Sequence, residues 1–130
     1  MRIGEIAKRA GVSVQAIRLY ERRRLMRTPR RTAAGYRIYS EADLEIVTVI
    51  KRMQRFGFKM VEIRRVLQLW ILPGDTNGAS PYQQGSHECL RQVLIIGEKK
   101  LEAMNEQIRF SIQLREELEQ ALSQLRAGLR

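Results

Sequence analysis

The residues best suited to chemistry follow Ser13, in a stretch whose apolar residues recur at helical spacing. Glutamine and arginine side chains match the donors and acceptors of base edges in the major groove of DNA, and arginine also pairs with phosphate oxygens. The first turns of such a helix are the part that meets the bases. We therefore expect this stretch to contact double-stranded DNA; a helix whose arginines are merely solvated is the alternative. The expected contact residues are Ser13, Val14, Gln15, Arg18, Tyr20 and Arg22.

A tight turn is needed to present this helix, and the chain offers one at Gly11-Val12-Ser13. Gly11 can take the positive φ that ends a preceding helix, Val12 can pack between two helices, and Ser13 can cap the second helix. Apolar residues at helical spacing lie on both sides of the turn. The pattern predicts a helix-turn-helix over residues 3–23, and a small helical hairpin is the other interpretation.

The next segment, residues 27–39, contains loop residues followed by strand-like alternation over residues 36–39. Two short strands joined by this loop would form a wing beside the helix-turn-helix. Guanidinium and phenol groups both suit phosphate oxygens. Packing of one or both tyrosines onto the helices is the alternative, with Arg37 favoured as a phosphate contact and Tyr36 as a packing residue. The wing candidates are Arg31, Tyr36, Arg37 and Tyr39.

A second pair of helices is expected over residues 41–72. Ser40 and Asp43 have the spacing of a capping box, and Gly57 is placed to end the first helix of the pair. Apolar residues at three- and four-residue spacing give each helix one buried face. These helices complete a mainly helical domain that spans residues 1–72.

A linker rich in glycine and proline, residues 73–86, leads to a long helical pattern over residues 87–127. Twelve positions recur there at steps of three and four, and nine of them are apolar, as in a coiled-coil seam. The helix would be on the order of 60 Å long, too long to fold back onto the preceding domain. It needs a partner, and a second copy of the chain is the simplest one. The twelve positions are Leu90, Leu94, Gly97, Leu101, Met104, Ile108, Ser111, Arg115, Leu118, Leu122, Leu125 and Leu129.

Charge is divided unevenly along the chain. Residues 1–65 contain 17 Lys and Arg against 6 Asp and Glu, a net charge of +11, whereas residues 66–130 contain 7 against 8, a net charge of −1. A phosphate backbone favours such a basic region through counterion release. A membrane surface would favour an amphipathic basic helix with exposed large apolar residues, which the sequence does not contain. Nucleic acid is therefore the expected partner, and a membrane is not.

The sequence also bears on compartment and on catalysis. It contains no apolar run of membrane-spanning length and no signal peptide, and its single cysteine fits a reducing environment, so a cytoplasmic protein is expected. An enzyme is not expected. One histidine, no paired carboxylates in a loop context and no glycine loop for phosphate leave nothing for catalysis to use.

Several motifs occur together in the order found in one known family. They are the run from Ile3 to Leu25, Gly35-Tyr36-Arg37-Ile38-Tyr39, Asp43-Leu44, and Phe56-Gly57-Phe58 with Glu62-Ile63. Over roughly the first 70 residues, the sequence resembles the MerR family of bacterial transcription regulators. The resemblance implies a winged helix-turn-helix, antiparallel pairing of the long helix in a homodimer, and an inverted-repeat site on DNA. One departure is Lys59, which stands where a capping serine is common.

The resemblance also implies a mechanism. The dimer would bind an overlong promoter spacer, and an effector would make it twist or bend the DNA so that RNA polymerase engages both promoter elements. A substantial bend costs on the order of 1–6 kcal/mol, which contacts on two half-sites can offset. A repressor or architectural DNA-binding protein without an effector is the alternative.

His87 and Cys89 are the candidate effector residues. They resemble the H-x-C stretch of the subgroup that senses divalent metals, in which further thiolates come from a carboxyl-terminal loop of the other subunit. No cysteine or histidine follows Cys89 here, so that closed thiolate site cannot be assembled. Three interpretations of Cys89 remain: an ordinary small residue near a helix start, a redox-active thiol, and a partial ligand for a soft metal ion together with His87 and carboxylates.

Overall fold

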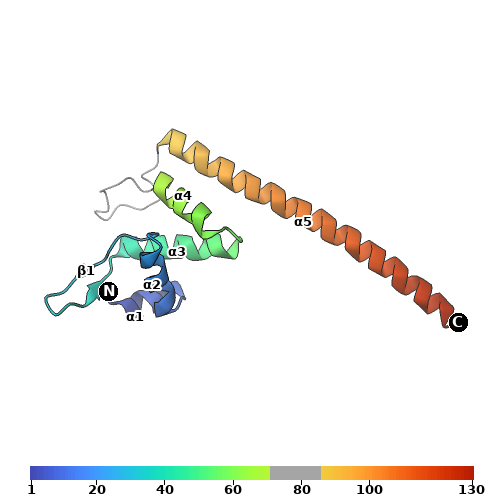
Figure 1. The fold of residues 1–130 in the computed structure, drawn as a ribbon, viewed down its shortest axis with the longest axis horizontal. Helices are drawn as coiled ribbons and strands as arrows, with labels where there is room; N and C mark the ends of the chain where they lie inside the picture. The colour runs from blue at the N-terminus through green and yellow to red at the C-terminus, as the bar shows by residue number, and fades with distance from the viewer. Residues whose placement is uncertain (71–85) are drawn as a thin grey trace. The chain divides into compact units, whose positions relative to one another are not determined.

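The computed structural model describes residues 1–70 and 86–130, and it is mainly helical (Figure 1). It divides into two compact units, Met1–Leu94 and Ile95–Arg130. Within the first unit, α1 packs against α2 and α3, and α3 packs against α4. The elements in chain order are α1 (Ile3–Ala10), α2 (Val14–Arg22), β1 (Arg30–Arg31), β2 (Arg37–Ile38), α3 (Glu41–Arg55), α4 (Met60–Trp70) and α5 (His87–Gly128).

The predicted helix-turn-helix is confirmed in its details. Gly11 ends α1 with a φ of 71°, and the Ser13 hydroxyl accepts a hydrogen bond from the Ala16 amide at 3.0 Å. A third helix closes the turn from outside, because Lys51 of α3 donates through Nζ to the carbonyls of Ala10 and Gly11 at 3.3 and 3.1 Å. A Cβ added at Gly11 would lie 2.7 Å from that Nζ, but the exposed lysine chain can shift, so it is the positive φ that favours glycine at this position.

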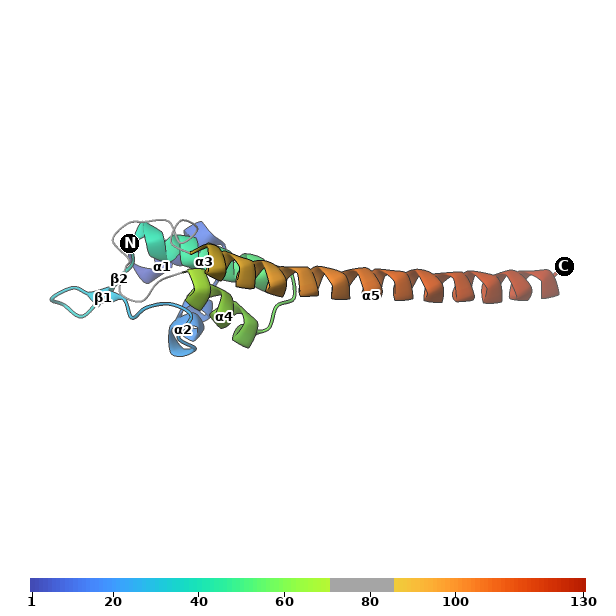
Figure 2. The same cartoon turned by 90° about the horizontal axis from the view of Figure 1, so that it is seen from above.

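The wing is a short antiparallel hairpin in which Arg30 pairs with Ile38 and Arg31 with Arg37. Its loop projects from the helices of the first unit in both views (Figures 1 and 2). Backbone pairing continues beyond β2, since the Tyr39 amide donates to the Met1 carbonyl at 2.7 Å and the Met1 nitrogen donates to the Tyr39 carbonyl at 2.8 Å. These bonds fasten the base of the wing to the segment that precedes α1.

Both helices of the second pair have identifiable caps at their starts. The predicted capping box is present, because the Ser40 hydroxyl accepts from the Asp43 amide at 3.2 Å while the Asp43 carboxylate accepts from the Ser40 amide at 2.8 Å. α3 ends at Arg55, and Gly57, two residues later, takes a positive φ of 86° as predicted for the glycine that follows the helix. The absence of a serine before α4 is offset by Glu62, whose carboxylate accepts from the Lys59 amide at 2.9 Å.

The core of the first unit is formed by one apolar face from each helix. The predicted apolar positions of this helix pair are Leu44, Val47, Ile50, Met53, Ile63, Val66, Leu67 and Trp70. Leu44 is half-buried, the side chain of Trp70 lies outside the described part of the structure, and the other six are buried. Ile46, Val49 and Leu69 are buried in addition. Predicted residues 71 and 72 of the last helix, and residues 73–85 of the predicted linker, lie outside the described part of the chain. The fully buried large side chains are Ile6, Ile17, Ile50, Ile63 and Val47.

The long helix α5 has a different character. It runs one residue beyond the predicted end, and the Ser86 hydroxyl caps its start by accepting from the Cys89 amide at 3.1 Å. None of its residues is buried in the single chain, although the predicted seam contains large apolar side chains such as Leu101 and Leu118, which are 58% and 60% exposed. No helix in the described part of the chain is both long and apolar enough to cross a membrane.

Candidate nucleic-acid interface

α2 has one face inside the domain and one face open. Ile17 and Tyr20 point into the core, whereas Gln15, Arg18 and Arg22 are exposed. Within the described residues, the side chains of these three have no hydrogen-bond or ion-pair partner, so their donors and acceptors are available to a ligand. This open face is what direct contact with base edges and phosphates requires.

Tyr20 differs from its predicted role as a contact residue. The side chain is only 2% exposed, its hydroxyl donates to the Gln54 amide oxygen of α3 at 2.9 Å, and burial raises the pKa of the phenol. The physical reason is helical spacing, because Tyr20 lies three residues after the buried Ile17 and therefore on the same face. In this structure Tyr20 lies on the buried face of α2 and links that helix to α3.

The first residues of α2 combine structural and surface roles. The Ser13 hydroxyl is exposed but already accepts the amide of Ala16, which leaves its proton free to donate. Val14 is half-buried. A ligand at this end of α2 would meet a small apolar surface beside a capping hydroxyl.

The wing presents two of its predicted residues to solvent. Arg31 is exposed, and its Nη1 donates to the Gly35 carbonyl at 2.9 Å, which braces the loop. Tyr36, predicted as a packing residue, is instead 53% exposed, and the Arg2 guanidinium lies 4.2 Å from the centroid of its ring. That arrangement adds a cation to the wing surface that sequence reasoning did not include.

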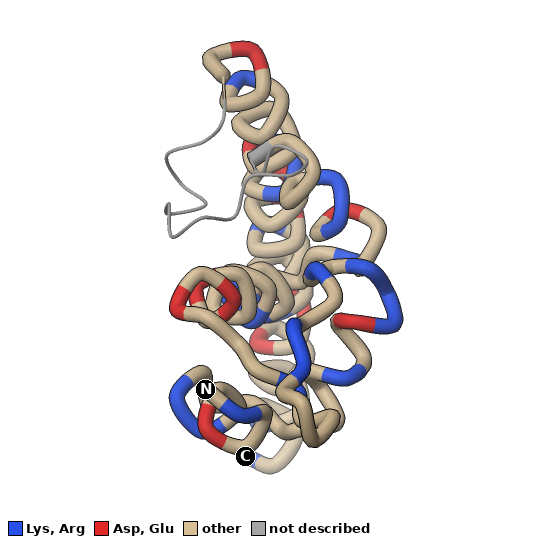
Figure 3. Tube along the Cα trace, turned by 90° about the vertical axis from the view of Figure 1, so that its left-hand side faces the viewer, with Lys and Arg blue, Asp and Glu red and all other residues tan. Residues whose placement is uncertain are grey.

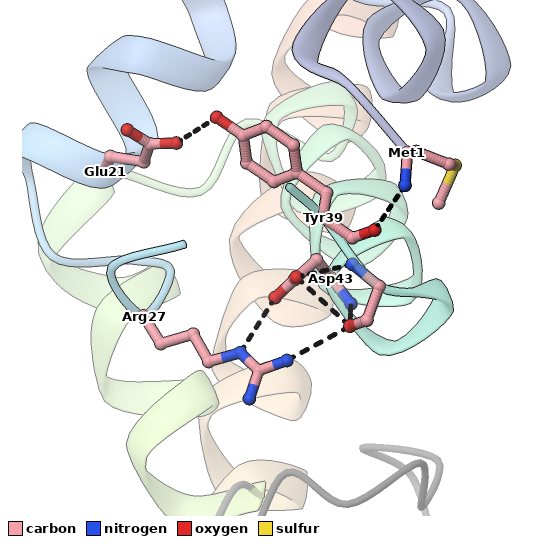
Figure 4. Close-up of polar contacts among 6 residues, drawn as sticks. Met1, Glu21, Arg27, Tyr39 and Asp43 are labelled. Atoms are coloured by element: carbon pink, nitrogen blue, oxygen red, sulfur yellow. Dashed lines mark hydrogen bonds and ion pairs between the residues drawn. The ribbon is translucent and has the colours of Figure 1, made fainter. Parts of the chain in front are cut away.

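Arg37 and Tyr39 both face a carboxylate of α2, and Figure 4 shows the contact made by Tyr39. The Tyr39 hydroxyl donates to Oε1 of Glu21, and Arg37 Nε lies 3.6 Å from Oε2 of the same residue. Tyr39 is 2% exposed, which differs from its predicted phosphate contact. Its pKa is raised well above the usual range, first by burial and then by the hydrogen bond and charge of Glu21, so the phenol stays protonated and can donate.

A second polar cluster fixes the loop after α2. Arg27 Nε lies 3.2 Å from Oδ1 of the buried Asp43, and Arg27 Nη2 donates to the Ser40 hydroxyl at 3.1 Å (Figure 4). Farther back, Arg64 of α4 donates through Nε to the carbonyl of Arg23 at 3.1 Å. These contacts join segments distant in sequence, so local patterns gave no signal for them.

The basic residues of the first unit occur in all four of its short helices, in the loop after α2 and in the wing strands, among few carboxylates. Figure 3 shows Lys and Arg in blue and Asp and Glu in red along the backbone. Several of those carboxylates are engaged with arginine, as in Glu41 with Arg9 at 2.7 Å. The Arg9 guanidinium, mainly through its hydrogen bond, lowers the pKa of Glu41. The exposed surface is therefore net positive and suited to a polyanion.

His87 and Cys89 lie at the start of α5, where His87 is exposed and Cys89 is half-buried. Across the described ranges, no three or more His, Cys, Asp and Glu residues are grouped so as to hold a metal ion. The described residues alone thus do not provide the ligands of a closed metal site. The sensing roles of His87 and Cys89 remain predictions.

The fold and this surface define a winged helix-turn-helix protein. Residues 1–70 match the MerR HTH family of regulatory proteins, and the chain belongs to that family. The mercuric resistance operon regulatory protein of Bacillus cereus is 47% identical over 66 residues, which cover 51% of this chain and 50% of that protein. The chain thus spans about half the length of the curated relatives it matches.

Solved structures share the fold over most of the chain. The transcription regulator PbrR691 of Ralstonia metallidurans CH34, solved in complex with lead(II), is 29% identical with a TM-score of 0.60, covering 97% of this chain and 85% of that one. HiNmlR, a MerR family regulator lacking the sensor domain and solved bound to promoter DNA, is 19% identical with a TM-score of 0.62, covering 83% and 72%. At the latter identity the likeness concerns the fold alone.

Proposed function

We propose that this protein is a transcription regulator that binds a palindromic promoter spacer as a homodimer and acts by distorting the DNA. The observation that carries the proposal is the open face of α2, where Gln15, Arg18 and Arg22 are exposed and unpaired among the described residues. Family membership supports it. Base edges would be read by this face, and phosphates would be bound by the wing.

Dimerisation is supported by α5. A helix of 42 residues, on the order of 60 Å long, exposes a mostly apolar seam that water solvates poorly. A second copy, paired antiparallel, would bury both seams at once. It would also place two identical DNA-binding units, called heads below, on one duplex. Because the two heads are related by a twofold axis, the matching site is an inverted repeat.

Activation follows from geometry in this proposal. Two heads joined by one pair of α5 helices, the rod, prefer a particular separation and twist between half-sites. DNA with a spacer of another length must bend or twist before both heads can bind it. The required deformation costs on the order of 1–6 kcal/mol, an amount that the contacts of two heads can supply. RNA polymerase would then engage promoter elements whose spacing the distortion has corrected.

Binding-site selection with the purified protein tests the proposal. We expect an inverted repeat whose affinity falls steeply with salt. Arg18→Ala should weaken binding by about 1–3 kcal/mol and relax one base position in each half-site. The matched control is Arg126→Ala, an exposed arginine of α5 in the second unit, which should bind as the unaltered protein does. Recovery of no palindrome, or of a monomer by sedimentation, would refute the proposal.

A regulator without an effector is the second candidate. It is favoured by the lack of a group of three metal ligands within the described residues. Promoter transcription with and without metals, oxidants and amphiphilic cations separates the two candidates, since only an effector-driven regulator responds. Cys89→Ser in the same assay tests the thiol directly: a response to metals or electrophiles that the substitution leaves unchanged would exclude both the redox and the metal-ligand interpretations of Cys89.

A further inference from the structure

Glu21 is a carboxylate in the last turn of α2, next to the surface proposed to meet phosphates. An acidic group there opposes the approach of a polyanion, so its position calls for an explanation. The side chain is 12% exposed, and its contacts are both with the wing. Oε1 accepts from the Tyr39 hydroxyl (Figure 4). Oε2 faces Arg37 Nε at 3.6 Å.

The hydrogen bond from Tyr39 to Glu21 is held firmly, whereas the ion pair between Arg37 and Glu21 is loose. Tyr39 is buried, stays protonated and has its backbone bonded to Met1 on both sides, so its bond to Glu21 is part of the fixed frame. Arg37 is 30% exposed in its side chain, and 3.6 Å is long for a charge-assisted hydrogen bond. The Arg37 guanidinium is thus held loosely and can exchange its carboxylate for a phosphate.

We propose that Glu21 is a positioning residue for operator recognition: it fixes the wing relative to α2 through Tyr39 and withholds the charge of Arg37 from duplexes that do not fit both elements. The inference rests on the proposed function. On a cognate site, α2 and the wing reach the duplex together, and Arg37 transfers to a phosphate. On other duplexes the wing is poorly placed, Arg37 stays with Glu21, and binding is weaker.

Glu21→Gln separates charge from geometry. The amide oxygen still accepts from the Tyr39 hydroxyl, whereas Arg37 loses its ionic partner. One additional phosphate contact makes the slope of log K against log salt steeper by about 0.9, which at about 0.1 M salt corresponds to about eightfold tighter binding. We expect this gain on a random-sequence duplex and little gain on the selected palindrome, so the ratio of the two affinities should fall by about eightfold.

Two further variants establish that the effect acts through the named contacts. With Arg37→Ala already in place, Glu21→Gln should leave the salt slope for random-sequence DNA unchanged, because no guanidinium is left to release. Tyr39→Phe keeps the ring and removes the bond to Glu21, so it should lower the affinity ratio without steepening the slope. Glu41→Gln is the control, since it removes one carboxylate from an exposed pair with Arg9.

The outcomes can be told apart. A steeper slope for Glu21→Gln that disappears with Arg37→Ala supports the inference. An unchanged slope and ratio, an effect that persists without Arg37, or an equal effect of Glu41→Gln would overturn it, whereas lower thermal stability of Glu21→Gln with unaltered binding would show a merely structural role and overturn it too. If the unaltered protein prefers no palindrome, the proposed function itself fails.

Discussion

The two units of this chain differ in the burial of their apolar side chains. In the first unit, the helices bury isoleucine, valine and leucine among themselves, and polar links such as Arg27 to Asp43 hold the loops. In the second unit, a single helix leaves every residue at least partly exposed. The comparison teaches that the first unit, the head, supplies its own core, whereas the second unit, the rod, would acquire one only by association.

The largest expected effect tests the independence of the head. Ile50 of α3 is 0% exposed, so Ile50→Ala should lower the free energy of unfolding of the head by about 2–5 kcal/mol, because a cavity replaces packed methyl groups. Thr48→Ala, at an exposed site on the same helix, should change it by less than about 0.5 kcal/mol. Chemical denaturation followed by circular dichroism measures both, and equal losses would contradict a core centred on Ile50.

A smaller effect tests the need of the rod for a partner. Leu118→Asp should weaken self-association by at least about 1.5–3 kcal/mol, because a leucine that the proposed dimer would bury is replaced by a charge in the seam. The melting of the head should not change. Gln113→Asp, which lies five residues earlier and away from the seam, should leave the dimer intact. Sedimentation equilibrium gives the result, and a dimer insensitive to Leu118→Asp would place the interface elsewhere.

The smallest effect distinguishes the polar links of the head from its surface charges. Asp43→Ala removes both the carboxylate half of the capping box of α3 and the partner of Arg27, and should cost about 1–2 kcal/mol. Glu41→Ala removes a carboxylate from the exposed pair with Arg9, where solvent and salt screen the interaction, so the loss should be below about 1 kcal/mol and fall with added salt. Thermal unfolding at two salt concentrations compares them.

Local chemistry made much of the fold predictable. The αL glycine at Gly11, the cap at Ser13 and the capping box of Ser40 and Asp43 each depend on residues within three positions of one another, and all are present. The long helix α5 was likewise predictable, because helical periodicity over tens of residues has few other interpretations, whereas its pairing along a seam stays a prediction.

The site was less predictable, because its tyrosines were judged by what a phenol can bind rather than by where it lies. Tyr20 and Tyr39 are buried through contacts with Gln54 and Glu21, which are 34 and 18 positions away. Tyr36 differs in the opposite direction, because packing was the favoured interpretation and the side chain is exposed. Pairings across such separations depend on how the helices pack, which no local motif records, and Glu21 was overlooked for the same reason.

The bonds from Lys51 to the carbonyls of Ala10 and Gly11 bear on protein engineering. A peptide reduced to α1 and α2 would lose the two Lys51 bonds that hold the turn between them. The angle between the two helices would then no longer be fixed. A design that grafts this helix-turn-helix onto another scaffold should therefore include α3, because α3 supplies Lys51.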